Sequence, residues 1–259
     1  MTAVQRVLLP DTNQSPVHVI KGIQVANDLC RELGIADVIF LIPTKDSLTS
    51  GPLHNALGAD LHNSLEKGKP VKLPCGARMR CEAVTTLKWL SSPSVVIAVF
   101  AGQNMMDKID SLQNLAAVVA VPWTPDAIEG WVKTWSPKVL GEPTRPGKPA
   151  KAKPKLIADP VVEQAMKSLT TVANRANNTM HPADEDYAKR IFRILRAHNH
   201  GEPAENIKLW AISNGWLPKT AARLEVLAEK AFGLSTKPKL DNPEQAAQLY
   251  KRWSDAAAP

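Results

Sequence analysis

The chain has 259 residues, of which 44% are hydrophobic and 22% charged, and its formal net charge at pH 7 is +7. This length accommodates two ordinary domains, and the composition excludes a disordered chain. The longest apolar run, residues 95–101, is far shorter than the ~20 residues of a membrane-spanning helix, so we expect no membrane partner.

The number and spacing of the cysteines indicate the redox state of the cellular compartment. Cys30, Cys75 and Cys81 are few and odd in number, and the sequence has no CxxC motif. Such usage is typical of a reducing environment and argues against a disulfide framework. The first residues lead directly into a strand-like apolar run and lack the pattern of a secretory signal. We therefore expect a cytoplasmic protein whose thiols are free and buried or half-buried.

Residues 1–140 alternate short apolar runs with amphipathic stretches. This pattern predicts a Rossmann-like α/β domain of three layers, with a mainly parallel sheet between helices. The predicted strands are Arg6–Leu9, Asp37–Ile42, Ser94–Phe100 and Ala116–Val121, with a hairpin between Val71–Leu73 and Ala77–Cys81. The predicted helices are Val17–Leu33, Leu53–Leu65, Glu82–Leu90, Asn104–Leu112 and Asp126–Trp135.

Polar residues follow several of these strands, at the edge where parallel sheets bind ligands. The candidate ligand-binding residues are Asp11, Asn13, Lys45, Asp46, Gln103 and Asn104. One interpretation is a phosphate-type ligand held by Lys45 and helix N-termini, and the other is that these residues only cap turns. The sequence has no GxGxxG, GxxxxGK[ST] or GxSxG motif, so it predicts no catalytic residue and no cofactor.

The sequence predicts no metal site either. His54 and His62 lie eight positions apart on a predicted helix, whereas a metal-binding pair of histidines favours closer spacing. We interpret both as surface histidines. Cys75 and Cys81 flank a predicted turn, but no matching pair of ligands completes a zinc site.

Residues 143–155 contain four prolines, five basic residues and no acidic residue. Proline prevents a helix or a central strand there, and repulsion between like charges extends the segment. We predict a linker at 141–156 between the α/β domain, 1–140, and a second domain, 157–259. The linker either contacts nucleic acid or is a solubilising spacer. Its basic residues are Arg145, Lys148, Lys151, Lys153 and Lys155.

In residues 157–259 every periodic stretch is helical. Helices are predicted from Asp159-Pro160 onward, over Pro182–Ala197, Pro203–Ser213 and Pro218–Phe232, and from Asn242-Pro243 onward. The break at Asn214-Gly215-Trp216 joins two short helices, as in a helix-turn-helix unit. A glycine suits the positive φ that such a turn requires.

In a helix-turn-helix unit, Pro218–Phe232 would be the recognition helix. Lys219, Thr220 and Arg223 are then the candidates for base edges, and Lys189, Arg190, Arg193 and Arg196 the candidates for phosphates. Glu225 and Glu229 on the same helix would repel phosphate. A helical hairpin is also an ordinary packing unit, so docking onto a protein is the alternative.

Three functions follow from these features. The first is a cytoplasmic nucleic-acid-binding or regulatory protein, with an α/β domain that senses a ligand or partner and a helical domain that contacts double-stranded DNA. The second is a non-catalytic subunit that docks onto another polypeptide through its C-terminal helices. The third is an enzyme acting on a nucleotide or other phosphorylated substrate at the strand ends.

Overall fold

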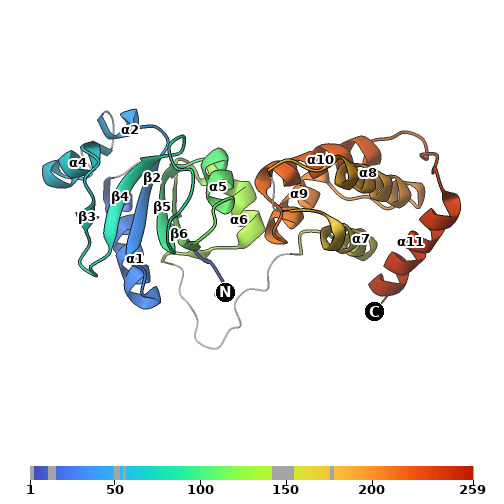
Figure 1. The fold of residues 1–259 in the computed structure, drawn as a ribbon, viewed down its shortest axis with the longest axis horizontal. Coiled ribbons are helices and arrows are strands. Elements are labelled where there is room, and N and C mark those ends of the chain that lie inside the picture. Colours follow the sequence, from blue (N-terminus) through green and yellow to red (C-terminus); the bar gives the residue numbers. More distant parts are fainter. Residues whose placement is uncertain are drawn as a thin grey trace. The chain divides into compact units, whose positions relative to one another are not determined.

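A computed structural model of the chain describes residues 3–10, 16–49, 53–54, 57–141, 155–175 and 178–258. The chain divides into two compact units, Met1–Ala152 and Lys153–Pro259. The first, the α/β unit, contains a sheet and helices, and the second, the helical unit, contains only helices among its described residues (Figure 1). No helix in the described part of the chain is long and apolar enough to cross a membrane.

The α/β unit is built on a seven-stranded sheet with the order β3-β4-β2-β5-β6-β1-β7. Neighbouring strands are parallel except for the β3–β4 pair, which forms the expected hairpin. The first strand lies between β6 and β7, near one edge of the sheet. The strands are β1 (Gln5–Leu8), β2 (Asp37–Ile42), β3 (Val71–Lys72), β4 (Arg78–Ala83), β5 (Ser94–Ala101), β6 (Leu115–Pro122) and β7 (Lys138–Val139).

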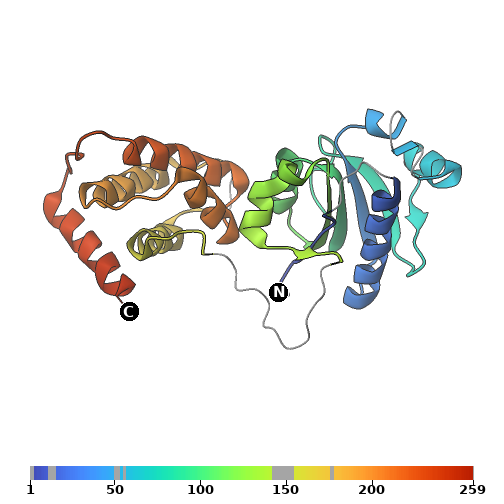
Figure 2. The ribbon, with the colours of Figure 1, turned by 180° about the vertical axis from the view of Figure 1, so that it is seen from behind.

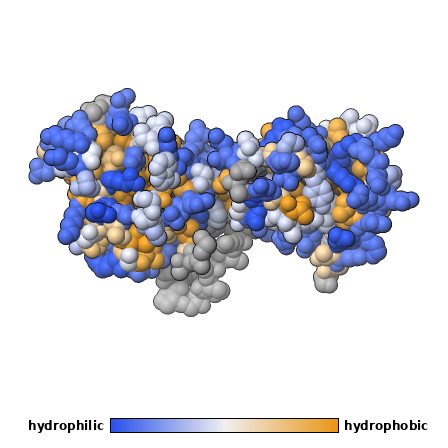
Figure 3. Space-filling view, in the orientation of Figure 1, coloured by the Kyte–Doolittle hydropathy of each residue, from blue (hydrophilic) through white to orange (hydrophobic). Residues whose placement is uncertain are grey.

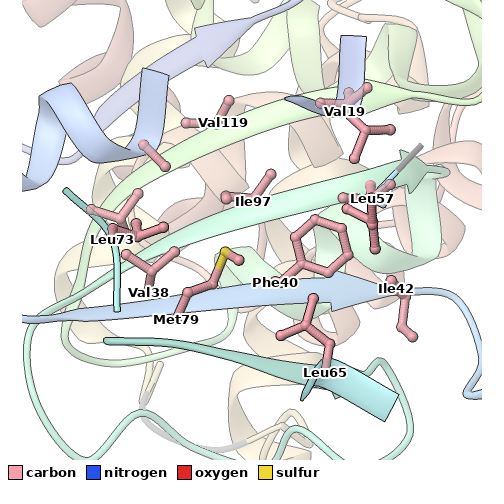
Figure 4. Close-up of a cluster of buried hydrophobic side chains, with 14 of the residues drawn as sticks. Val19, Val38, Phe40, Ile42, Leu57, Leu65, Leu73, Met79, Ile97 and Val119 are labelled. Atoms are coloured by element: carbon pink, nitrogen blue, oxygen red, sulfur yellow. The ribbon is translucent and has the colours of Figure 1, made fainter. Parts of the chain in front are cut away.

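Helices cover both faces of the sheet (Figures 1 and 2). Alternate residues of a strand point to opposite faces, so Phe40 joins one hydrophobic cluster and its neighbours Ile39 and Leu41 join the other. Figure 4 shows the cluster around Phe40. The helices are α1 (Pro16–Leu33), α2 (Asp46–Thr49), α4 (Ala59–Glu66), α5 (Gln103–Asp110), the 3₁₀ helix η1 (Pro125–Ile128) and α6 (Glu129–Trp135).

The predicted helix Glu82–Leu90 is wrong. Glu82 and Ala83 end β4, and a turn follows in which the amides of Thr86 and Leu87 both donate to the carbonyl of Ala83. The Thr86 hydroxyl also bonds with the backbone of Ala83. Threonine side chains compete for backbone groups in this way, and β-branched residues such as Val84 disfavour a helix.

The helix predicted over Leu53–Leu65 is not continuous, because Leu53 and His54 are helical but a separate helix, α4, begins at Ala59. Gly58 precedes α4 with φ +67°, a conformation that a continuous helix cannot contain.

The interpretation of His62 as a surface histidine is wrong. Its side chain is buried, Nε2 lies 2.6 Å from the carbonyl oxygen of Leu48, and its ring centroid lies 4.5 Å from that of His54.

The helical unit follows the sequence pattern closely. Its helices are α7 (Pro160–Val172), α8 (Pro182–Ala197), α9 (Ala204–Ser213), α10 (Pro218–Phe232) and α11 (Pro243–Ala257). The N-caps Asp159 and Asn242 accept backbone hydrogen bonds, as their residue types favour. The turn between α9 and α10 places Gly215 at φ +85°. Phe192 of α8 meets Phe232 of α10 edge to face, which joins two of these helices in one core.

Candidate functional site

The connections that leave β2 and β5 diverge at the carboxyl edge of the sheet. After β2 the chain crosses the face of Phe40, where Leu48 and Leu65 pack. After β5 it crosses the opposite face, where Met105 and Met106 pack. Because β2 and β5 are neighbours, this divergence is a topological switch point, where open α/β sheets leave a crevice for ligands.

Lys45 and Asp46, two of the candidate ligand residues, follow β2 and line a cavity of about 290 Å³. The cavity lies at the ends of β2 and β4, beside α4. Its aliphatic lining comprises Ile42, Leu48, Leu65 and Ala83. Its other lining residues are Lys45, Asp46, Glu66, Gly68, Cys81, Glu82 and Thr86. The structure therefore brings two expected residues together with several that the sequence did not indicate.

Glu82 and Thr86 were missed because they fell within the wrongly predicted helix. The Thr86 hydroxyl donates to Glu82 Oε2 at 2.7 Å, and Arg80 Nη1 donates to Glu82 Oε1 at 2.9 Å. Both Glu82 oxygens therefore have donors inside the protein. The carboxylate is held in place at the boundary with a second cavity, of about 190 Å³, that Arg80 and the exposed Trp89 also line.

The thiol of Cys81 faces the first cavity as a neutral group. Burial and, to a lesser extent, the charge of Glu82 raise the pKa of Cys81 to about 12, while the charge of Lys45 opposes the shift. A thiol with this pKa carries little thiolate at neutral pH, so it is a poor nucleophile and metal ligand. Cys30 is buried, and Cys75 and Cys81 are half-buried; all three are free, as predicted.

The other candidate ligand residues lie apart from this cavity or outside the described residues. Gln103 and Asn104 begin α5 after β5, and Gln103 donates to Asp107 within the same helix. Asn104 is exposed. Asp11 and Asn13 lie outside the residues that the structure describes.

The end of β5 has an uncommon backbone. Phe100 has φ +54°, a conformation that a bulky residue rarely adopts, and the pairing with β6 shifts register between Val99 and Ala101. The Phe100 ring meets Trp123 edge to face at 5.1 Å, and Trp123 is 42% exposed. An aromatic side chain therefore reaches the surface beside the switch point.

In the helical unit, the basic residues expected to contact phosphates are bonded to acceptors of the same unit. Lys189 pairs with Glu185 and Asp186, and Arg193 pairs with Asp241 and donates to the carbonyl of Lys239. Arg190 donates to Gln245, and Arg196 donates twice to the carbonyl of Leu234.

The residues expected to meet base edges have three different environments. Lys219 is exposed at the start of α10. Thr220 is buried, and its hydroxyl donates to the carbonyl of Leu217, which counts against direct contact with a base. Arg223 forms a bidentate pair with Glu185 of α8.

Among the linker residues, Lys155 is exposed and donates to the carbonyl of Ala158. The other basic residues of the linker, Arg145, Lys148, Lys151 and Lys153, lie outside the described residues.

A groove of about 560 Å³ opens between α9 and α10. Val226 is 37% exposed there, and Phe232 is half-buried. The remaining lining residues are Glu202, Ala204, Glu205, Glu225, Glu229 and Gly233. Lys208 pairs with Glu225 at 3.2 Å, and Glu202 accepts hydrogen bonds from the backbone of Ala158 and Asp159. The groove is thus acidic, with apolar side chains among the acids.

A polar cluster links three parts of the helical unit. His200 Nδ1 lies 2.6 Å from Asp159 Oδ2, and His200 Nε2 lies 3.0 Å from the hydroxyl of Tyr250. The ring of His198 stacks on that of Tyr250, with centroids 3.6 Å apart. The structure shows that His200 joins the N-cap of α7 to α11.

The described residues contain no group of three or more His, Cys, Asp or Glu side chains that could hold a metal ion.

Comparison with known proteins gives a match for the helical unit alone. Residues 158–254 match the family model described as "Domain of unknown function (DUF1889)". No curated protein and no solved structure matches the chain.

Proposed function

We propose that this protein is a non-catalytic interaction protein whose helical unit docks onto another polypeptide. The observation that carries the proposal is that three basic residues of α8 and α10 pair with carboxylates inside the helical unit. Lys189, Arg193 and Arg223 each bond a carboxylate of the same unit. Contact with DNA phosphates would have to compete with these bonds, so the helices offer a weakened electrostatic footprint for nucleic acid.

The side chains that line the groove between α9 and α10 indicate which kind of partner it binds. Apolar side chains such as Val226 and Phe232 favour burial against an apolar face, and the surrounding glutamates favour positive charge. An amphipathic helix that carries lysine or arginine beside its apolar residues meets both requirements. On the face shown in Figure 3 the helical unit is mostly hydrophilic with small hydrophobic areas, which also favours a partner with charged groups.

Double-stranded DNA is the second candidate partner. The order of α9, a glycine turn and α10 supports a helix-turn-helix unit, and Lys219 is exposed at the N-terminal end of α10. Binding of this kind weakens steeply as salt rises. Glu225, which is partly exposed, and Glu229, which is exposed, lie on the same helix and oppose it.

Fluorescence anisotropy with the full chain distinguishes the two partners. The probes are a labelled amphipathic Lys/Leu peptide and a labelled DNA duplex, each at low and physiological salt. We expect the peptide to bind, Glu229→Lys to weaken it, and Lys219→Glu, outside the groove, to leave it unchanged. Binding of the duplex alone, strengthened by Glu229→Lys and lost with Lys219→Glu, would contradict docking and support the second candidate.

The α/β unit completes the proposal as a Rossmann-like sensor that uses the carboxyl edge of its sheet. The diverging connections of β2 and β5 support this use. A cytoplasmic location stays our expectation, and the free state of Cys30, Cys75 and Cys81 supports it.

A further inference from the structure

We infer that Cys30 and Cys75 are a site of oxidative modification, where a peroxide converts two thiols into a reversible disulfide. The pair lies at the amino edge of the sheet, whereas the proposed function concerns the helical unit and the carboxyl edge. The inference rests on the way in which α1 and the turn before β4 bring together two cysteines that are far apart in the sequence.

The topology of the sheet brings the two cysteines to the same edge. Cys30 lies near the end of α1, which leads into β2, and Cys75 lies in the turn that leads into β4. The strands β2 and β4 are parallel neighbours that begin in register, with Asp37 opposite Arg78. Segments that lead into parallel neighbouring strands meet at the amino edge of the sheet, so α1 and this turn lie there together.

A buried side chain of α1 holds the turn in place. Asn27 is buried, and its Oδ1 accepts a hydrogen bond from the backbone amide of Cys75 at 2.9 Å. The amide of Leu73 donates to the carbonyl of Ala77 at 2.8 Å, which closes the turn around Cys75. Because residues three positions apart on a helix share a face, the bond to Asn27 places Cys75 beside Cys30.

The two thiols are in contact. The side chains of Cys30 and Cys75 are hydrogen-bonded to each other, and Cys75 packs against the hydrophobic cluster that contains Cys30. Burial and, to a lesser extent, the neighbouring Cys75 raise the pKa of Cys30 to about 12, so Cys30 carries little thiolate at neutral pH. Since Cys30 is buried and Cys75 is half-buried, an oxidant in solution reaches Cys75 first.

The reaction with hydrogen peroxide takes two steps. The sulfur of Cys75 attacks one peroxide oxygen, the O–O bond breaks, and the thiol proton leaves with the other oxygen as water, which makes a sulfenic acid on Cys75. The sulfur of Cys30 then attacks the sulfur of that sulfenic acid. The S–S bond forms, the S–O bond breaks, and the hydroxide takes the proton of Cys30 as a second water. Two thiols are oxidised, and one peroxide is reduced to two waters.

Peptide mapping by mass spectrometry tests the inference. The full chain is reduced and treated with hydrogen peroxide at neutral pH, and its remaining thiols are blocked with N-ethylmaleimide. We expect a pair of peptides that joins Cys30 to Cys75 and that dithiothreitol separates. Oxidation should also raise the melting temperature by about 5–10 °C, because the disulfide closes the long loop that contains β2, α4 and β3.

Cys30→Ala and Cys75→Ala should each abolish both the disulfide and the increase in melting temperature. The matched control Cys81→Ala removes the other half-buried thiol and should leave both unchanged. If Cys30→Ala proves unfolded, Cys75→Ala carries the test, because Cys75 lies half-buried in a turn.

The disulfide must join these two cysteines of one chain. Absence of the Cys30–Cys75 peptides, with Cys75 either unmodified or oxidised only to the sulfinic acid, would overturn the inference. A disulfide through Cys81 or between two copies of the chain would overturn it as well. None of these results depends on the peptide-binding assay, so the two proposals fail separately.

Discussion

Arg223 of α10 donates two hydrogen bonds to the carboxylate of Glu185 of α8, from Nε at 2.9 Å and from Nη2 at 2.6 Å. Lys189 also contacts the same carboxylate, at 2.9 Å. A bidentate pair of this kind fixes the planes of both groups and therefore the relative position of two helices. The residue that would read DNA bases in a recognition helix instead joins that helix to its neighbour.

The first prediction concerns acid stability. Hydrogen bonds from Arg223 and Lys189 lower the pKa of Glu185 to about 2 from its ordinary value of 4.5. A carboxylate with a depressed pKa contributes stability that is full above pH ~4.5 and is lost as pH falls towards 2. Glu185→Gln should therefore lower the melting temperature at neutral pH by about 2–4 °C and lower it less at pH 2–3.

Thermal unfolding from pH 2 to pH 7 measures this difference. The control is Glu244→Gln, which changes an exposed glutamate at the start of α11. A constant difference between wild type and Glu185→Gln across this range would show that the pair does not carry the acid sensitivity.

The helical unit could be predicted from its sequence almost residue by residue. Its proline starts, caps and apolar spacing act locally, and Pro182–Ala197 and Pro218–Phe232 have the bounds expected of them. The α/β unit was predicted less well where tertiary contacts determine the secondary structure. The apolar spacing of residues 82–90 suits a helix, but pairing with β2 holds Glu82 and Ala83 in a strand.

Buried ionisable groups of the α/β unit give a second prediction. Burial raises the pKa of Asp110 to about 6, although the hydrogen bond from Trp135 and the charge of Arg6 oppose the shift. A carboxyl with a raised pKa binds its proton more tightly in the folded state. Stability should therefore decline as pH rises from about 4 to 6, by at most about 3 kcal/mol.

Asp110→Asn should remove this decline with pH, even if it also changes the free energy of unfolding by the same amount at every pH. Urea unfolding across that pH range measures it, and the control is Asp126→Asn, which changes an exposed residue of η1. A variant that keeps the full decline between pH 4 and 6 would assign it to another group.

Helix α1 supplies a third prediction, about packing. A Cβ added to Gly22 would lie 3.1 Å from Val121 Cγ2 and 3.5 Å from Ile97 Cγ2, so α1 approaches the sheet closely there. Gly22→Leu overfills this contact and should destabilise the protein by about 1–3 kcal/mol, despite the better helix propensity of leucine. Lys21→Leu, exposed on the same helix, should change the free energy of unfolding much less. Equal effects in urea unfolding would contradict the close approach.

The site was predictable only in part, and for the same reason as the fold. Lys45 and Asp46 could be expected because they follow β2, whose almost continuously apolar sequence is typical of a buried strand. Glu66 reaches the same cavity from a helix that begins after Gly58, and no local signal places it opposite β4. The link from His200 to Asp159 and Tyr250 spans 41 and 50 positions, a separation at which spacing in the sequence carries no information.

That link carries the last prediction. His200 contacts the N-cap of α7 and the hydroxyl of Tyr250 on α11, and removal of its ring breaks both contacts. His200→Ala should therefore loosen α11 and raise the amide exchange rates of Pro243–Ala257 ~10-fold, while those of α8 and α10 stay within a few-fold of wild type. Asn199→Gly is the control, because Asn199 has φ +63° and glycine tolerates that conformation. Hydrogen exchange monitored by mass spectrometry measures both variants. Unchanged protection of α11 in His200→Ala would mean that Ala246 and Trp253, its buried side chains, hold the helix without the histidine.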